Sequence, residues 1–244
     1  MPQLRRVPVL TLAVVAVTVV ISAVSVASPT VLAHLERTPA GLHGQWWRTF
    51  TSLFAQSSAA GAASNLFFML VLGVVAEQVA SRYRWLACYF GAGIVGELVA
   101  YSWQPVGAGN SVAVCGLAGL IALACWRRDA RLPPFGAFAL LVWCAVLLST
   151  WAWPAPVVGA VFATVGLRLQ GAGWRYAGEF AVAVTLATGV FLACVRDIHG
   201  AALVAGVALA ALLGGVAREP LRARPRPGQR QILTSAERAP DEGG

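Results

Sequence analysis

The sequence has few charged residues. Only 11% of its 244 residues are Asp, Glu, Lys or Arg, and lysine is absent altogether. An ordinary soluble domain carries roughly 25% charged residues, so this composition argues against a soluble globular protein. The hydrophobic share of 58% and the mean hydropathy of +0.71 also exclude a disordered chain. The class that remains is a polytopic helical membrane protein.

Cysteine is sparse, and its spacing indicates neither a disulfide framework nor a metal site. The sequence has five cysteines, all within apolar runs, and no C-x-x-C pair. Thiol-ligated metals and small disulfide scaffolds need clustered cysteines. We therefore expect these side chains to act as small hydrophobic residues. They are Cys88, Cys115, Cys125, Cys144 and Cys194.

The positive charge comes from arginine alone. All eighteen basic residues are arginine, and the formal net charge is +8. In a soluble protein this charge would suggest binding to nucleic acid. Here most arginines flank apolar runs, a pattern typical of membrane topology because cytoplasmic loops are enriched in Lys and Arg. We expect a lipid bilayer as the surroundings and no nucleic acid partner.

Apolar runs close to membrane-spanning length predict eight candidate helices. A transmembrane helix needs about 20 predominantly apolar residues. The first run is longer than the roughly 7 to 15 apolar residues of a signal peptide, so we expect it to be retained as a helix. The runs cover residues 7–27, 65–81, 85–103, 111–126, 135–151, 156–169, 180–195 and 200–216.

The distribution of arginines predicts how these spans are oriented. With the N-terminus in the cytoplasm, fifteen of the eighteen arginines fall on the cytoplasmic side, and Arg37, Arg48 and Arg196 fall outside. An even number of spans, six or eight, keeps both termini in the cytoplasm. We expect a transmembrane domain over residues 1–217. The Arg- and Pro-rich segment 218–244 has too few apolar residues to fold, so we expect a disordered cytoplasmic tail there.

Polar residues within or beside the spans are few, and three of them are predicted to meet. Asn65, Ser111 and His199 each stand at the predicted outer start of a span. Polar residues at membrane depth often mark functional sites. Each also has a structural interpretation, because Asn and Ser are common helix N-caps and an interfacial histidine is often only solvated.

Two glutamates also lie within predicted spans. Glu77 stands near the inner end of its span, where it could accept hydrogen bonds between helices or act as an acid. Glu97 lies among small residues at four-residue spacing, which favours close packing against a neighbouring helix. Neither position alone decides between structure and function.

The order of motifs after the first span resembles that of one membrane protein family. A Trp47-Arg48 pair lies in the long external loop, and Asn65 begins the next span. An L-G-x-x-x-E sequence, which finishes at Glu77, lies towards the end of the same span. These residues and their spacing resemble the first loop and second helix of the rhomboid intramembrane proteases.

A second segment, at the start of the fourth span, extends the resemblance. It reads G-N-S-V-A-V-C-G-L-A-G from Gly109 and contains Ser111 and Gly116. Rhomboid proteases carry G-x-S-G-x-x-x-G-L-x-G at this place, and the serine is their nucleophile. The resemblance covers residues 45–119.

The resemblance implies an all-α, rhomboid-like bundle of six core transmembrane helices, to which the eight candidate spans would add two. It also implies a multi-pass serine protease of the cell membrane that cleaves single-span membrane proteins near the outer face, without metal or cofactor. His199 would take the proton of Ser111, and the Asn65 amide would hold the oxyanion, as peptide hydrolysis requires. Structural positions of the fold would be Trp47, Arg48, Glu77, Gly109 and Gly116.

Four positions depart from the family pattern. Rhomboid proteases place their histidine three residues before a glycine of the last helix, where this chain has Leu203. His199 lies four positions earlier, about 6 Å nearer the outer surface on a helix. Gly61, Val112 and Cys115 replace a histidine, a glycine and an aromatic residue of the family. Losing one oxyanion donor costs about a hundred- to thousand-fold in rate.

Two functions therefore remain open: an intramembrane protease, or a rhomboid-like pseudoprotease that binds transmembrane helices without cutting them. Contact between Ser111 and His199 would favour the protease. A Leu203 side chain in that place, with His199 turned to the headgroups, would favour the pseudoprotease. A transporter is disfavoured because the sequence has no inverted halves. The sequence specifies neither the substrate nor the oligomeric state.

Overall fold

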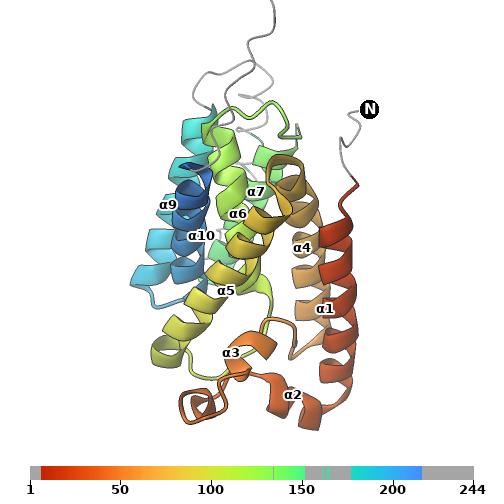
Figure 1. Cartoon of the computed structure of the whole chain (residues 1–244). Helices are drawn as coiled ribbons and strands as arrows, with labels where there is room; N and C mark the ends of the chain where they lie inside the picture. The colour runs from red at the N-terminus through yellow and green to blue at the C-terminus, as the bar shows by residue number, and fades with distance from the viewer. Residues whose placement is uncertain (1–6, 134, 152–160, 162–163, 165–176, 216–244) are drawn as a thin grey trace, which may run out of the picture. The chain divides into compact units, whose positions relative to one another are not determined.

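The computed structural model describes residues 7–133, 135–151, 161, 164 and 177–215, and these residues up to Leu213 form one compact helical unit. Its regular elements are all helices (Figure 1). They are α1 (Val9–Ala27), α2 (Pro29–Leu35), η1 (Pro39–Leu42), α3 (Arg48–Thr51), α4 (Ala59–Val79), α5 (Arg82–Trp103), α6 (Ser111–Trp126), α7 (Gly136–Ser149), α9 (Ala177–Cys194) and α10 (Ile198–Gly215).

The helices agree with the expected polytopic membrane protein. Helices α1, α4 and α5 are each long and apolar enough to cross a membrane. Helices α6, α7, α9 and α10 are also apolar but shorter. The predicted span 156–169 falls almost wholly outside the described residues, and the predicted tail 218–244 lies entirely outside them. The prediction of an all-α membrane bundle is confirmed.

Helix α4 begins earlier than its apolar run. The sequence predicts a start at Asn65, but α4 starts at Ala59 because the Ser58 hydroxyl accepts the backbone N–H of Gly61 and caps the helix. Asn65 therefore lies in the second turn, and its side chain is not an N-cap. The first turns of α4 contain small and polar residues, so the hydrophobic run begins later than the helix.

Helix α6 forms the centre of the bundle and packs against α4, α5, α7 and α9 (Figure 1). All of its residues except Ser111, Leu123 and Trp126 are buried, as expected for a helix that is apolar on every side. A Cβ atom on Gly116 would lie 2.0 Å from the Cys88 carbonyl oxygen of α5. The glycine is thus required for backbone contact between the two helices.

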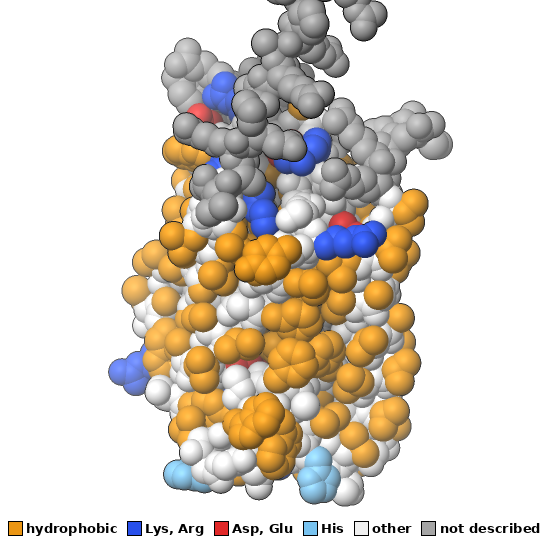
Figure 2. Space-filling view, viewed as in Figure 1, with side chains coloured by type: hydrophobic (Ala, Val, Ile, Leu, Met, Phe, Trp, Pro, Cys, Tyr) orange, Lys and Arg blue, Asp and Glu red, His pale blue; other side chains and the backbone are white. Residues whose placement is uncertain are grey.

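Large apolar side chains cover the outside of the bundle at the level of the helices. Val20, Phe67 and Val190 are each more than half exposed. Figure 2 shows hydrophobic side chains along the height of one face and arginine side chains mainly towards its upper end. An exposed apolar band of this kind is what a lipid-facing surface requires.

Charged residues gather at one end of the bundle. Arg84, at the start of α5, interacts electrostatically with Arg127 and Arg131 in the loop after α6. In the same loop, Arg128 forms a 3.3 Å ion pair with Glu179 at the start of α9. The structure thus brings together arginines that the sequence assigns to the cytoplasmic side. The assignment of that side to the cytoplasm stays a prediction.

Candidate active site

The side chains of Ser111 and His199 meet at the other end of the bundle. Ser111 is the first residue of α6 and His199 the second residue of α10. The Ser111 Oγ lies 2.9 Å from His199 Nε2, which is hydrogen-bonding distance between a hydroxyl and an imidazole. Leu203, the alternative occupant, is fully buried in the hydrophobic core. His199 is therefore directed at the serine, although its side chain remains 23% exposed.

The close approach of α6 and α10 explains how His199, four positions before the expected histidine position, reaches Ser111. A Cβ atom on Gly119 would lie 2.2 Å from the backbone carbon of Gly206, so the two backbones touch there. Ser111 precedes this contact by about 12 Å of helix and His199 by about 10.5 Å, at 1.5 Å per residue. The two side chains consequently reach the same level although the family spacing is not kept.

Asp197 lies behind the histidine, in the link between α9 and α10. One carboxylate oxygen is 2.6 Å from His199 Nδ1 and also accepts the His199 backbone N–H at 2.9 Å. The other oxygen accepts the indole N–H of Trp151 at 2.6 Å. Burial tends to raise the pKa of this carboxyl, but the bonds and charge of His199 and the Trp151 bond outweigh it and lower the pKa to about 2.

A row of carboxamides orients Asn65 beside the serine. The Asn65 amide donates to Gln56 Oε1 at 3.1 Å, and the Gln56 amide donates to Asn110 Oδ1 at 2.7 Å. Asn110 in turn contacts the Met69 sulfur through its amide at 3.1 Å. Gln56 and Asn110 are both buried, so this network is held rigidly. The second N–H of the Asn65 amide remains available to another acceptor.

Gly109 keeps the space between Asn65 and Ser111 open. Its φ of +156° is uncommon for residues with a side chain. A Cβ atom there would be in ordinary van der Waals contact with both polar groups, 3.4 Å from Asn65 Nδ2 and 3.6 Å from Ser111 Oγ. The backbone conformation favours glycine, and an added side chain would lie beside the Asn65 and Ser111 side chains.

Arg37 anchors the loop that leads into Ser111. Its side chain is buried, forms an ion pair with Glu97 of α5 and donates to the Gln104 carbonyl at 2.8 Å through Nη2. The Arg37 and Gly107 backbones also exchange hydrogen bonds of 2.9 and 3.1 Å. From the sequence, Arg37 was expected only as an external arginine and Glu97 as part of a packed helix face, and neither expectation includes this ion pair.

Trp47 and Arg48 fold the outer segment that surrounds α3. The buried Arg48 side chain donates from Nη1 to the carbonyls of Ala33 and Glu36 at 2.6 and 2.9 Å. These carbonyls close the C-terminus of α2, where helix carbonyls lack intrahelical partners. Trp47 precedes α3, and its carbonyl accepts the Thr51 N–H at 2.8 Å. Arg48 thus holds the outer segment together through its side chain, whereas Trp47 contributes a backbone carbonyl and its side chain is 42% exposed.

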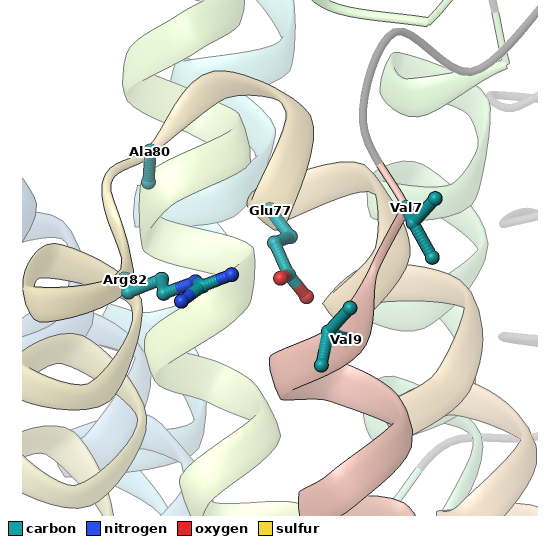
Figure 3. A pocket seen from close by; sticks show the side chains of 5 residues that line it. All are labelled: Val7, Val9, Glu77, Ala80 and Arg82. Carbon is teal, nitrogen blue, oxygen red and sulfur yellow. The ribbon is translucent and has the colours of Figure 1, made fainter.

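Glu77 caps α1 at the opposite end of the molecule. Its carboxylate accepts the backbone N–H groups of Leu10 and Thr11 at 3.1 and 2.9 Å and the Thr11 hydroxyl at 2.8 Å. Figure 3 shows the carboxylate beside the start of α1, with the Arg82 side chain extending towards it across a cavity of about 480 Å³. Glu77 therefore acts as the structural acceptor between helices.

A cavity of about 400 Å³ opens onto Ser111 and His199. It lies between α4, α6, α7 and the α9–α10 link. Gly61 contributes no side chain to its α4 wall, which Ser64 and Asn65 complete. Val112 is buried, and a Cβ atom on Gly96 of α5 would meet it at 2.4 Å. The lining residues are Gly61, Ser64, Asn65, Ser111, Trp143, Val146, Leu147, Thr150, Trp151, Asp197 and His199.

Two further interpretations from the sequence are settled by these contacts. The capping alternative for Ser111 is wrong, because Asn110 holds the N-cap position of α6 and Ser111 is the first helical residue. Cys115 is fully buried in the core, one helical turn after Ser111, and lies outside the cavity lining. No aromatic ring is therefore supplied from that position.

Comparison with known proteins assigns a large part of the chain. A family model described as the Rhomboid domain matches residues 43–167, slightly more than half of the chain. The match includes α3 to α7 and ends before α9 and α10, so His199 and Asp197 lie outside it. No curated protein and no solved structure was found to match the chain.

Proposed function

The chain belongs to the rhomboid family, and from this premise we propose that it is an intramembrane serine protease. The observation that carries the proposal is the 2.9 Å contact between Ser111 Oγ and His199 Nε2 inside a cavity. A serine is a weak nucleophile until a neighbouring base accepts its proton, and this geometry provides one.

The proposed reaction uses three groups. His199 takes the Ser111 proton as the oxygen attacks the substrate carbonyl, and the protonated imidazole then passes that proton to the leaving amine. The Asn65 amide and the Ser111 backbone N–H, which is free in the first helical turn, hold the oxyanion. Water, activated by the same imidazole, then hydrolyses the acyl-enzyme and releases the second product.

The proposed substrates are single-span membrane proteins cleaved near the outer face of the cell membrane. The support is positional: the site lies at the end of the bundle opposite Arg84, Arg127 and Arg131. That end is expected outside the cell because arginine-rich loops favour the cytoplasm. Because α4 and α7 both line the cavity, we expect a substrate helix to approach it along these two helices.

The test is cleavage of a single-span substrate by the purified protein in liposomes. Ser111→Ala and His199→Ala should each abolish product, whereas Ser102→Ala and His43→Ala should not, because both lie exposed outside the cavity. Equal product from wild type, S111A and H199A would mean a contaminating protease and would overturn the proposal. No cleavage by wild type, with substrate still co-purifying, would favour the helix-binding pseudoprotease.

A further inference from the structure

We infer that Asp197 is a positioning residue for His199, so that the site works as a Ser111–His199–Asp197 triad rather than as a dyad. The inference rests on the proposed protease function. It concerns a residue outside the part of the chain that the family model matches.

The hydrogen bonds around His199 define which ring nitrogen carries the proton. Ionised carboxylates only accept hydrogen bonds, so the 2.6 Å contact with Asp197 Oδ1 places the proton on Nδ1. The lone pair of Nε2 then faces the Ser111 hydroxyl at 2.9 Å. This is the tautomer that a general base requires, and the carboxylate selects it.

The Asp197 carboxylate is itself held in place and charged. Its side chain is only 8% exposed, and Trp151 donates its indole N–H to the second oxygen. The low pKa, about 2, keeps the group ionised at neutral pH. A fixed negative charge at Nδ1 stabilises the imidazolium that forms when Ser111 loses its proton.

Helix capping is the competing explanation for this residue. The Asp197 N–H donates to the Leu192 carbonyl and closes α9, and its carboxylate accepts the His199 N–H and caps α10. Capping, however, needs only a neutral oxygen at this position, and Asn or Ser supplies one. The contact with Nδ1 is the one that requires a negative charge, and substitutions can therefore separate the two roles.

The decisive variant is Asp197→Asn, measured in liposomes with the single-span substrate. The same oxygen, Oδ1, accepts both the His199 backbone N–H and the Nδ1 proton, so asparagine can keep both bonds with its amide oxygen in that place. It removes the negative charge that stabilises the imidazolium, and it turns an amide nitrogen towards the Trp151 indole N–H in place of Oδ2. We expect kcat to fall about a hundred- to ten-thousand-fold, with KM close to that of wild type and the protein still folded at the assay temperature. The rate of Ser111 labelling by a fluorophosphonate should fall in parallel.

Two variants complete the design. Trp151→Phe removes the donor to Asp197 Oδ2 and keeps the ring, so its kcat should fall only several-fold. Asp129→Asn is the matched control, because this carboxylate pairs with Arg131 in the loop after α6, at the other end of the bundle. It should keep wild-type rates. If Asp197→Asn does not fold, Asp197→Ser, which retains a capping oxygen, decides by the same criterion.

The outcomes separate this inference from the proposed function. Wild-type kcat in D197N, with S111A and H199A inactive, would overturn the triad and leave a dyad protease. A parallel loss of kcat and labelling in a folded variant would support the triad. An inactive, unlabelled wild-type protein would overturn both.

Discussion

The backbone contact between α6 and α10 predicts that a single methyl group will separate Ser111 from His199, the proposed catalytic pair. An alanine Cβ at position 119 would lie 2.2 Å from the Gly206 backbone, whereas ordinary contact begins at 3.4 Å. Because a backbone atom cannot rotate away, the helices must separate by roughly 1.2 Å, the difference between those distances. The 2.9 Å contact between Ser111 and His199 would then lengthen to about 4 Å, beyond hydrogen-bonding range.

We therefore expect Gly119→Ala to lose activity more strongly than stability. A misplacement of about 1 Å costs about a hundredfold in rate, and one extra methyl group in a packed core costs about 1–3 kcal/mol in the free energy of unfolding. Liposome cleavage and fluorophosphonate labelling measure the first quantity, and unfolding in detergent measures the second.

Gly91→Ala is the matched control for this substitution. Its added Cβ would meet only Leu209 Cδ1 of α10, at 2.9 Å, and the end of a leucine side chain can move aside. It should keep near-wild-type activity. A folded G119A protein that cleaves and labels as fast as wild type would refute the argument that this contact sets the distance between serine and histidine.

Three further predictions concern the groups around the site and the cap of α1. Asn65→Ala should lower kcat about a hundred- to thousand-fold, and Gln56→Leu should lower it by up to the same factor with KM unchanged, because Asn65 loses its orienting acceptor. An unchanged kcat in Gln56→Leu would exclude that role. Glu77→Gln should destabilise the protein by about 1–3 kcal/mol in detergent unfolding, because an amide then faces the Thr11 N–H, whereas exposed Glu179→Gln should change stability by less than about 1 kcal/mol. The lowered pKa of Asp197, about 2 against roughly 3.9 unfolded, gives stability present above about pH 4 and lost as pH falls towards 2; melting temperatures of wild type should lose this increment relative to Asp197→Ser over that range, and parallel curves would contradict it.

The sequence predicted the parts of the fold and of the site that depend on local spacing. Apolar runs identified the long helices α1, α4 to α7, α9 and α10, but not the short helices of the outer segment, and the motif from Gly109 to Gly116 identified the start of α6. Glu77 was found by its distance from the preceding glycine, although its partner in α1 could not be known. Local patterns contain this information because a helix fixes the relative positions of residues a few places apart.

The remaining features depend on contacts between distant segments. The reach of His199 depends on where α6 and α10 touch, and a sequence comparison limited to one helix cannot supply that register. Gln56 and Arg37 lie in connecting segments whose partners are 54 and 60 residues away. Asp197 had a signal, since an acid two residues before a histidine can both cap the helix and reach the ring. Asp197 was not among the residues singled out from the sequence, where His199 was considered without its acidic neighbour.

The distance in sequence between Ser111 and His199 affects how the protein matures. The two residues are 88 positions apart, and the base arrives with α10. During synthesis the chain therefore carries its serine into the membrane well before any imidazole stands beside it. If the protein is a protease, a newly inserted chain would not cleave neighbouring membrane proteins until α10 has packed against α6. Proteolytic activity would then begin only when the described helices are assembled.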